Sequence, residues 1–188
     1  MGSSPCTDCN FTFTTGPGGQ RILSPAFEFL RLGRNTAQAL GTSADLQRVL
    51  DWPTVDENVN LLEASCPGAI RRVSSTVTAI DVAGWFHLSL GLHGESATNC
   101  LDAADDEFMA GVLIELDRGG VTSIIAADIK DRAVCRSFSY DCSVERRLEA
   151  GDLLRTFYWF DAINVVMADA SLPGSARNHF SVRTIRRA

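Results

Sequence analysis

Two histidines and a glutamate lie close together in the sequence and raise the question of a metal site. His87, His93 and Glu95 carry side chains of the kind that bind transition metals. Hydrophobic and polar residues alternate around them, which predicts a β-strand. The two histidines are six positions apart, and at about 3.3 Å per residue their rings would lie about 20 Å from each other. They cannot share one ion, and we predict no metal site here.

An acidic run follows, with the oxygen ligands that calcium prefers. It comprises Asp102, Asp105, Asp106 and Glu107. Their spacing does not match an EF-hand loop. A solvated loop is the simpler interpretation, and calcium binding stays open as the alternative.

Patterns for nucleophilic or phosphate chemistry are missing from the sequence. The chain contains no G-x-S-x-G, the motif that places a catalytic serine on a sharp turn. Gly16-Pro17-Gly18-Gly19 is not followed by the lysine and helix of a phosphate-binding loop. We therefore predict a protein with no catalytic residues, no bound metal and no cofactor.

Six cysteines leave the redox state open. Cys6 and Cys9 form a CxxC, but no second CxxC or histidine pair completes a zinc site. The other four are scattered, at Cys66, Cys100, Cys135 and Cys142. They fit buried free thiols in a reducing compartment or one or two disulfides outside it. If disulfides form, Cys135 and Cys142 are the pair nearest in sequence.

Composition limits the partners. The formal net charge of -6 on 188 residues argues against nucleic-acid binding. No apolar run approaches the roughly 20 residues that span a bilayer, so we expect no membrane insertion. The N-terminus, MGSSPCTDCN, has no secretory pattern. Lys130 is the only lysine, and the preference for arginine indicates a bacterial or phage genome. Arginines gather near the C-terminus as solvated side chains or as a grip on an acidic partner, at Arg177, Arg183, Arg186 and Arg187.

Residues 1–52 differ from the rest of the chain. Phe11–Thr15 alternates like a strand and meets a glycine-rich turn. Ser24-Pro25 and Thr42-Ser43 are typical helix starts, and Pro53 would end the second helix. Two short helices make no core, so we predict an N-terminal arm or attachment segment over residues 1–52. The alternative is that this segment packs against its own domain.

From residue 53 onward the pattern is all-β. Ala79–Gly94 is its clearest element, because Phe86, Leu88, Leu90 and Leu92 recur at a period of two. Asp117-Arg118-Gly119-Gly120 predicts a hairpin between two apolar runs. Many short strands without helices between them predict a β-sandwich or jelly roll over residues 53–188. The expected strands are Asn58–Glu63, Ile70–Ile80, Gly84–Gly94, Phe108–Asp117, Val121–Asp128, Ala133–Ser139, Leu153–Ala162, Asn164–Asp169 and His179–Arg186.

Three segments of this region resemble the C1q and tumour-necrosis-factor superfamily. Gly84-Trp85-Phe86-His87-Leu88 is similar to its G-x-[aromatic]-x-[apolar] strand, and Leu148–Leu154 to its L-x-x-G-D-x-[VL] turn. Phe180-Ser181 resembles the F-S-G that opens its last strand, with Val182 in place of the glycine. The resemblance implies a ten-stranded jelly roll that forms a homotrimer. The aromatic run Phe157–Phe160 agrees, because one pair of rings needs cover outside the core, either from another subunit or from loops and the arm.

These features together lead to a functional hypothesis. We expect a trimeric virion surface protein, either a capsid decoration (cement) protein or a short head or tail fibre of a phage. Residues 1–52 would bind the major capsid protein or a tail component, and the jelly roll would project. The first alternative is a tail-fibre tip that binds a host receptor or glycan. The second is a metal-dependent jelly-roll enzyme of the cupin kind, which the missing H-x-H pair disfavours.

Overall fold

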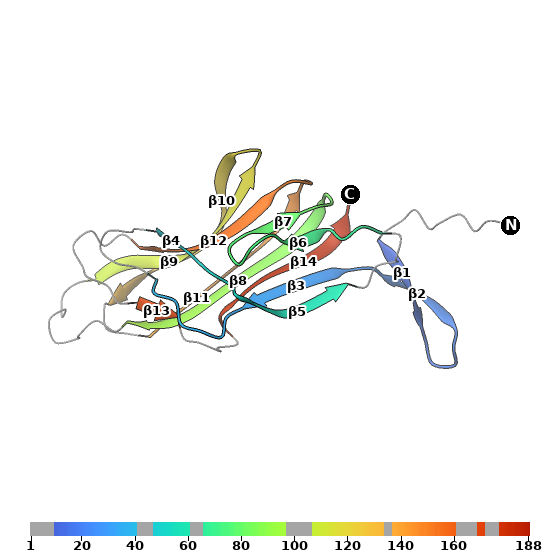
Figure 1. Cartoon of the computed structure of the whole chain (residues 1–188), viewed down its shortest axis with the longest axis horizontal. Helices are drawn as coiled ribbons and strands as arrows, with labels where there is room; N and C mark the ends of the chain where they lie inside the picture. Colours follow the sequence, from blue (N-terminus) through green and yellow to red (C-terminus); the bar gives the residue numbers. More distant parts are fainter. Residues whose placement is uncertain are drawn as a thin grey trace.

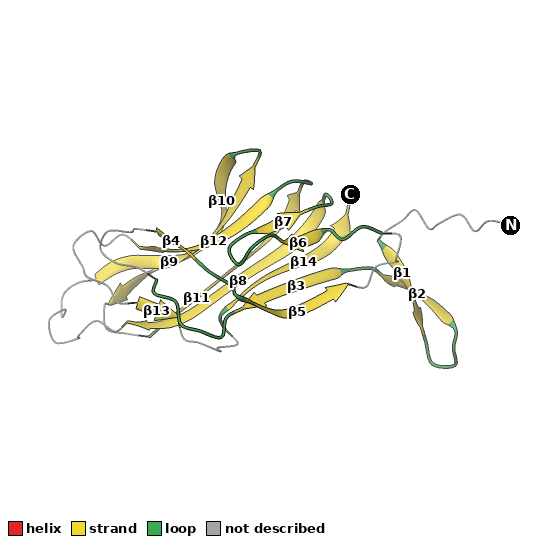
Figure 2. Ribbon diagram, viewed as in Figure 1, coloured by secondary structure: helices red, strands yellow, loops and turns green. Residues whose placement is uncertain are grey.

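The computed structural model describes residues 10–40, 47–60, 66–96, 107–133, 137–160, 169–171 and 177–188. In this part of the chain the regular elements are strands, joined by turns and loops (Figure 2). No helix there is long and apolar enough to cross a membrane. The strands are β1 (Phe11–Thr15), β2 (Arg21–Pro25), β3 (Glu28–Gly33), β4 (Gln47–Val49), β5 (Thr54–Asn60), β6 (Ile70–Arg72), β7 (Thr78–Ile80), β8 (Gly84–Ser96), β9 (Glu107–Arg118), β10 (Val121–Ala133), β11 (Phe138–Leu148), β12 (Leu153–Phe160), β13 (Asp169–Ser171) and β14 (His179–Arg187).

Two sheets form a sandwich, and a separate hairpin extends from one end of it (Figure 1). Sheet 1 has the order β10-β9-β12-β7-β6, and β4 also pairs with β12. Sheet 2 has the order β11-β8-β14-β3-β5, and β13 also pairs with β8. The strand pairs are antiparallel throughout the described residues. The predicted all-β jelly roll is confirmed.

Strand β8 lies inside sheet 2, between β11 and β14. Phe86, Leu88, Leu90 and Leu92 are fully buried on its inner face, as their alternation predicts. Burying side chains of this size stabilises the fold by roughly 1.5–3 kcal/mol each before the entropy cost is counted. Sheet 1 contributes the opposite half of the same core, with Val112, Ile114, Leu116, Tyr158 and Phe160.

The helix predicted after Ser24-Pro25 is wrong. Pro25 ends β2, and Glu28–Gly33 is a strand that pairs with both β14 and β5. The period of two in EFLRLG explains this, because Leu30 and Leu32 enter the core while Phe29 and Arg31 are only half-buried. Tertiary burial therefore outweighs the local capping signal.

The described part of the second predicted helix is also a strand. Thr42-Ser43 lies outside the described residues, but Gln47–Val49 forms β4 beside β12. Leu40, Leu50 and Trp52 are buried in the core. The described residues between Glu28 and Trp52 thus pack against their own domain, which was the alternative to a separate arm. Among the described residues of the predicted arm, β1 and β2 form a two-stranded sheet of their own outside the sandwich.

The predicted strand at Phe11–Thr15 is confirmed and belongs to the β1–β2 hairpin. Gly18 and Gly19 adopt positive φ angles in its turn, which glycine does without steric cost. The hairpin extends from the end of the sandwich where the C-terminus lies (Figure 1). Its base is fixed there, because the Arg187 amide donates to the Asn10 side-chain oxygen at 2.8 Å.

Several strand boundaries differ from the prediction. Ile70–Ile80 is two short strands, β6 and β7, with a turn between them. The described part of Ala133–Ser139 spans the end of β10 and the start of β11, which continues to Leu148. Asn164–Asp169 lies outside the described residues except for Asp169, where β13 begins. The hairpin predicted at Asp117-Arg118-Gly119-Gly120 is confirmed, with positive φ at both glycines.

Candidate functional site

All three histidines of the chain lie on the outward face of sheet 2. His87 and His93 alternate with the buried leucines of β8, and His179 begins β14 beside them. Arg31 of β3 and Arg183 of β14 share this face by register. We call this surface the histidine face. The alternation of β8 that builds the core therefore also presents a polar surface on its other side.

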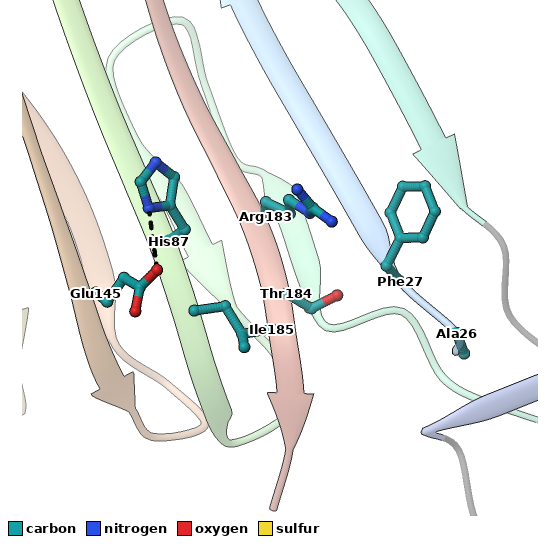
Figure 3. Close-up of a pocket in the computed structure, with 7 residues that line it drawn as sticks. All are labelled: Ala26, Phe27, His87, Glu145, Arg183, Thr184 and Ile185. Atoms are coloured by element: carbon teal, nitrogen blue, oxygen red, sulfur yellow. Dashed lines mark ion pairs between the residues drawn. The ribbon is translucent and has the colours of Figure 1, made fainter. Parts of the chain in front are cut away.

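A hollow of about 440 Å³ opens on the histidine face (Figure 3). On one side of it, His87 Nδ1 lies 3.7 Å from Glu145 Oε1. These two residues are cross-strand partners on β8 and β11. On the other side the Arg183 guanidinium lies over the Phe27 ring, 5.5 Å from its centroid. Ala26, Thr184 and Ile185 complete the lining.

A second, smaller hollow of about 270 Å³ adjoins the first and shares Glu145 and Ile185 with it. Its other lining residues are Trp85 and Arg186. Trp85 and Ile185 are 42% and 48% exposed, so two large apolar side chains face solvent side by side with arginine. Aromatic residues and arginine at an exposed apolar patch are typical of protein interfaces.

Further along the same face His179 lies over Gly91 of β8. A Cβ on Gly91 would lie 2.8 Å from His179 Cε1, 2.9 Å from Asp141 Oδ1 and against the Arg177 carbonyl oxygen. Gly33 of β3 likewise leaves the space that the Asp56 carboxylate occupies. Across the sheet, the Asp141 carboxylate, the His179 imidazole and the Asp56 carboxylate therefore lie in one row. Gly91 lies between the first two groups, and Gly33 lies between the last two.

His179 is half-buried in this row. Its Nε2 lies 3.3 Å from Ser89 Oγ. Burial lowers the pKa of the His179 imidazole and Arg31 lowers it further, against smaller opposite effects of the Arg177 backbone and of the Asp141 and Asp56 carboxylates. Near neutral pH the ring is uncharged.

Solved structures share the architecture of this chain. No family model matches the chain, and no curated protein matches it. Murine APRIL at pH 8.0 superposes with a TM-score of 0.59, 9% sequence identity, and 85% of this chain and 99% of that chain covered. The Eiger TNF from S. frugiperda gives 0.56 and 9%, with 87% and 95% covered. The chain has a TNF-like jelly-roll fold.

The motifs behind the predicted resemblance have structural roles in the TNF-like fold. Gly84 opens β8, where a Cβ would meet the Arg186 backbone. Gly151 turns the chain with a φ of 93°. Asp152 is buried beneath that turn, where it accepts from the Glu149 amide at 2.8 Å and pairs with Arg118 at 2.6 Å. Gly84, Gly151 and Asp152 therefore have structural roles, whereas Trp85 and His87 of the first motif line the hollows of the histidine face.

Metal-binding clusters are absent from the described residues of the TNF-like domain. These residues contain no group of three or more His, Cys, Asp or Glu side chains placed to hold a metal ion. Ser89 and His179 are in contact, but neither lines the two hollows above, where a substrate would have room. Asp102, Asp105 and Asp106 lie outside the described part of the chain, so the calcium alternative stays untested.

The structure gives the redox state of two of the six cysteines, Cys66 and Cys142. Cys66 is disulfide-bonded. Cys142 is a free thiol, so the suggested pair with Cys135 is wrong. It alternates with the outward residues of β11, and its side chain packs against the core of the TNF-like sandwich. Cys6, Cys9, Cys100 and Cys135 lie outside the described residues.

The arginines near the C-terminus separate into different roles, which the sequence did not predict. Arg187 is buried and pairs with the buried Glu28 at 2.7 Å. Arg183 packs on Phe27, and Arg186 borders the smaller hollow. An arginine one position from the end of the chain gives no sequence signal of burial, because its partner Glu28 is 159 positions away.

Proposed function

We propose that the chain is a non-enzymatic structural protein that forms a homotrimer through the histidine face. The observation that carries this is the exposed pair of Trp85 and Ile185 on one sheet of a TNF-like sandwich. Burial of apolar area contributes about 25 cal/mol per Å², so covering these side chains favours association. The trimer is the assembly that the resemblance to the tumour-necrosis-factor superfamily implies.

A closed ring of identical copies needs two different surfaces that fit each other. A second exposed apolar group lies on β10, the edge strand of sheet 1. Val121 is 72% exposed there, and Ile124 is also exposed. Val121 follows the turn at the end of β9, and Trp85 and Ile185 lie near the start of β8 and the end of β14. This group is the matching surface in our proposal.

The aromatic run Phe157–Phe160 supports assembly less than the sequence suggested. Tyr158 and Phe160 are in the core, as predicted for one pair. Phe157 is buried and Trp159 half-buried on the other face, where β4 pairs with β12 in register with both. Cover for this pair comes largely from the chain itself.

The biological setting that we propose is a virion surface. In this proposal the trimer decorates a capsid or forms a short fibre, and the segment before Glu28 binds the particle. The arginine-rich composition and the hairpin that stands off the sandwich support this setting (Figure 1). Isolated two-stranded hairpins are marginally stable in water, so a partner surface for β1 and β2 is physically reasonable.

A second candidate is a fibre tip that binds a receptor or glycan. The larger hollow favours it, because Phe27, His87 and Glu145 combine an aromatic ring with polar groups. Particle imaging separates the two roles: many copies over the head support decoration, and a few copies at a tail tip support recognition.

Light scattering tests the assembly proposal. We expect the full chain to have about three times the 20.4 kDa mass of one copy. Trp85→Arg, which adds charge to the exposed patch, should give folded monomers. Val73→Arg is the matched control, because Val73 is equally exposed but follows β6 in sheet 1. A trimer that persists in Trp85→Arg would contradict the chosen face, and a folded wild-type monomer would contradict assembly.

A further inference from the structure

The histidine face carries positive groups whose charge depends on pH. Arg31 and Arg183 are permanently charged there, and the three histidines lie among them. A histidine changes charge between about pH 5 and 8, which other side chains of ordinary pKa do not. Acid therefore adds positive charge to a face that already contains arginine.

His179 is the histidine most enclosed by charged groups. Arg31 approaches from β3, Asp56 from β5, Asp141 from β11 and Arg177 from the start of β14 itself. On β8 it contacts Ser89 and lies over Gly91, neither of which carries a charge. His93 lies two positions beyond Gly91, and the pair of His87 and Glu145 lies toward the other end of the face.

We propose that assembly through the histidine face is acid-sensitive, and that protonation of His179 drives the copies apart. This inference rests on the trimer proposed above. A second copy on this face removes water from a ring that is already half-buried beside Arg31. The protonated ring loses hydration in the assembly, whereas in the separate copy it keeps contact with solvent.

Linkage gives the direction of the effect. The separate copy takes up a proton at His179 more readily than the assembled copy does, so the association constant falls as pH falls. Each pH unit by which assembly lowers the pKa of His179 weakens association by up to about tenfold per protomer. His87 is the comparison residue, because it lies on the same face and its Nδ1 is 3.7 Å from Glu145 Oε1.

Sedimentation velocity of the full chain at pH 7.5 and pH 5.0 tests this, at constant ionic strength and over a range of protein concentrations. We expect a trimer at pH 7.5 and an increase of at least about tenfold in the half-dissociation concentration at pH 5.0. Near-UV circular dichroism at pH 5.0 should show that the separated copies stay folded. Unfolding at pH 5.0 in place of separation would overturn the inference.

Two variants assign the effect to a residue. His179→Gln keeps a polar contact for Ser89 and cannot become charged, so its trimer should hold equally at both pH values. His87→Gln removes a histidine from the same face and should keep the wild-type pH dependence. If His179→Gln separates in acid as the wild type does, His179 is not the switch. A wild-type trimer that is stable at pH 5.0 overturns the switch alone, and a folded monomer at pH 7.5 overturns the trimer as well.

Discussion

Replacing Arg187 by methionine should cost more stability than any other change of an arginine near the C-terminus. The side chains of Arg187 and Glu28 are 5% and 7% exposed, and their ion pair is 2.7 Å long. Arg187 also donates to the Pro67 carbonyl oxygen at 2.6 Å, and Glu28 accepts from the Ala69 amide at 2.6 Å. The pair thus joins β3, β14 and the loop before β6 in one buried network.

The size of the effect follows from the charge that is left behind. In Arg187→Met the Glu28 carboxylate stays buried with the Ala69 amide as its remaining donor among these contacts. Removing one partner of a buried ion pair costs about 3–5 kcal/mol of unfolding free energy. With a urea m-value of about 2 kcal/mol/M, the unfolding midpoint should fall by about 1.5–2.5 M.

Urea unfolding followed by tryptophan fluorescence, at one fixed protein concentration, measures this shift. Arg71→Met is the matched control, because the Arg71 side chain is 57% exposed and its surface ion pair with Asp81 contributes at most about 1 kcal/mol. The double variant Glu28→Gln with Arg187→Met should recover part of the loss, since no unpaired charge remains. A loss below about 1 kcal/mol in Arg187→Met, or a double variant less stable than both single ones, would refute the reasoning.

Three further predictions concern separate sites. Gly91→Ala should lower the unfolding free energy by about 1–3 kcal/mol, because the added Cβ meets the Arg177 carbonyl oxygen. Thermal unfolding measures this loss, with Ser143→Ala at an exposed position of β11 as the control. Asp152 is buried, which raises its pKa, but the bonds from Arg118 and the Glu149 amide outweigh this and hold the pKa below its usual value. Its contribution to stability is therefore present above about pH 4 and is lost in more acid solution, so Asp152→Asn should flatten the acid limb of the stability curve measured by urea titration. Burial and the Asp128 and Asp141 carboxylates raise the pKa of Cys142 to about 12, so iodoacetamide at pH 8 should label Cys142 only after unfolding, and peptide mass spectrometry would contradict this by finding it labelled in the native protein.

The sequence predicted the sandwich because its signals are local. The leucines of β8 and the glycines of the β9–β10 turn each need only their near neighbours in the chain to indicate a strand or a hairpin. The resemblance to the tumour-necrosis-factor superfamily rested on the same kind of short pattern, and the superposition on murine APRIL confirms the fold it implied.

The errors came where distant segments decide the structure. Ser24-Pro25 has the local chemistry of a helix start, but β14 and β5 offer β3 a place between them, and Leu30 and Leu32 are buried only as a strand. The register between β8 and β14 likewise places the three histidines on one surface. Spacing along β8 showed only that His87 and His93 are far apart, and gave no indication of His179.

The exposure of side chains on the histidine face is the property that was hardest to predict from the sequence. Alternation in GWFHL places Trp85 on the outward side of β8, but its exposure depends on whether another segment covers it. Among the described residues Trp85 borders a hollow with Ile185, an arrangement that register between β8 and β14 creates. The candidate site therefore could not be predicted from the sequence, because it depends on how the strands pair in the fold.

A crystal structure of the full chain at neutral pH tests the central claim most directly. The account predicts three copies around a threefold axis, with Trp85, Ile185 and His179 of each copy covered by a neighbouring copy. A histidine face open to solvent in every copy, or a trimer whose contacts leave Trp85 and Ile185 exposed, would contradict it.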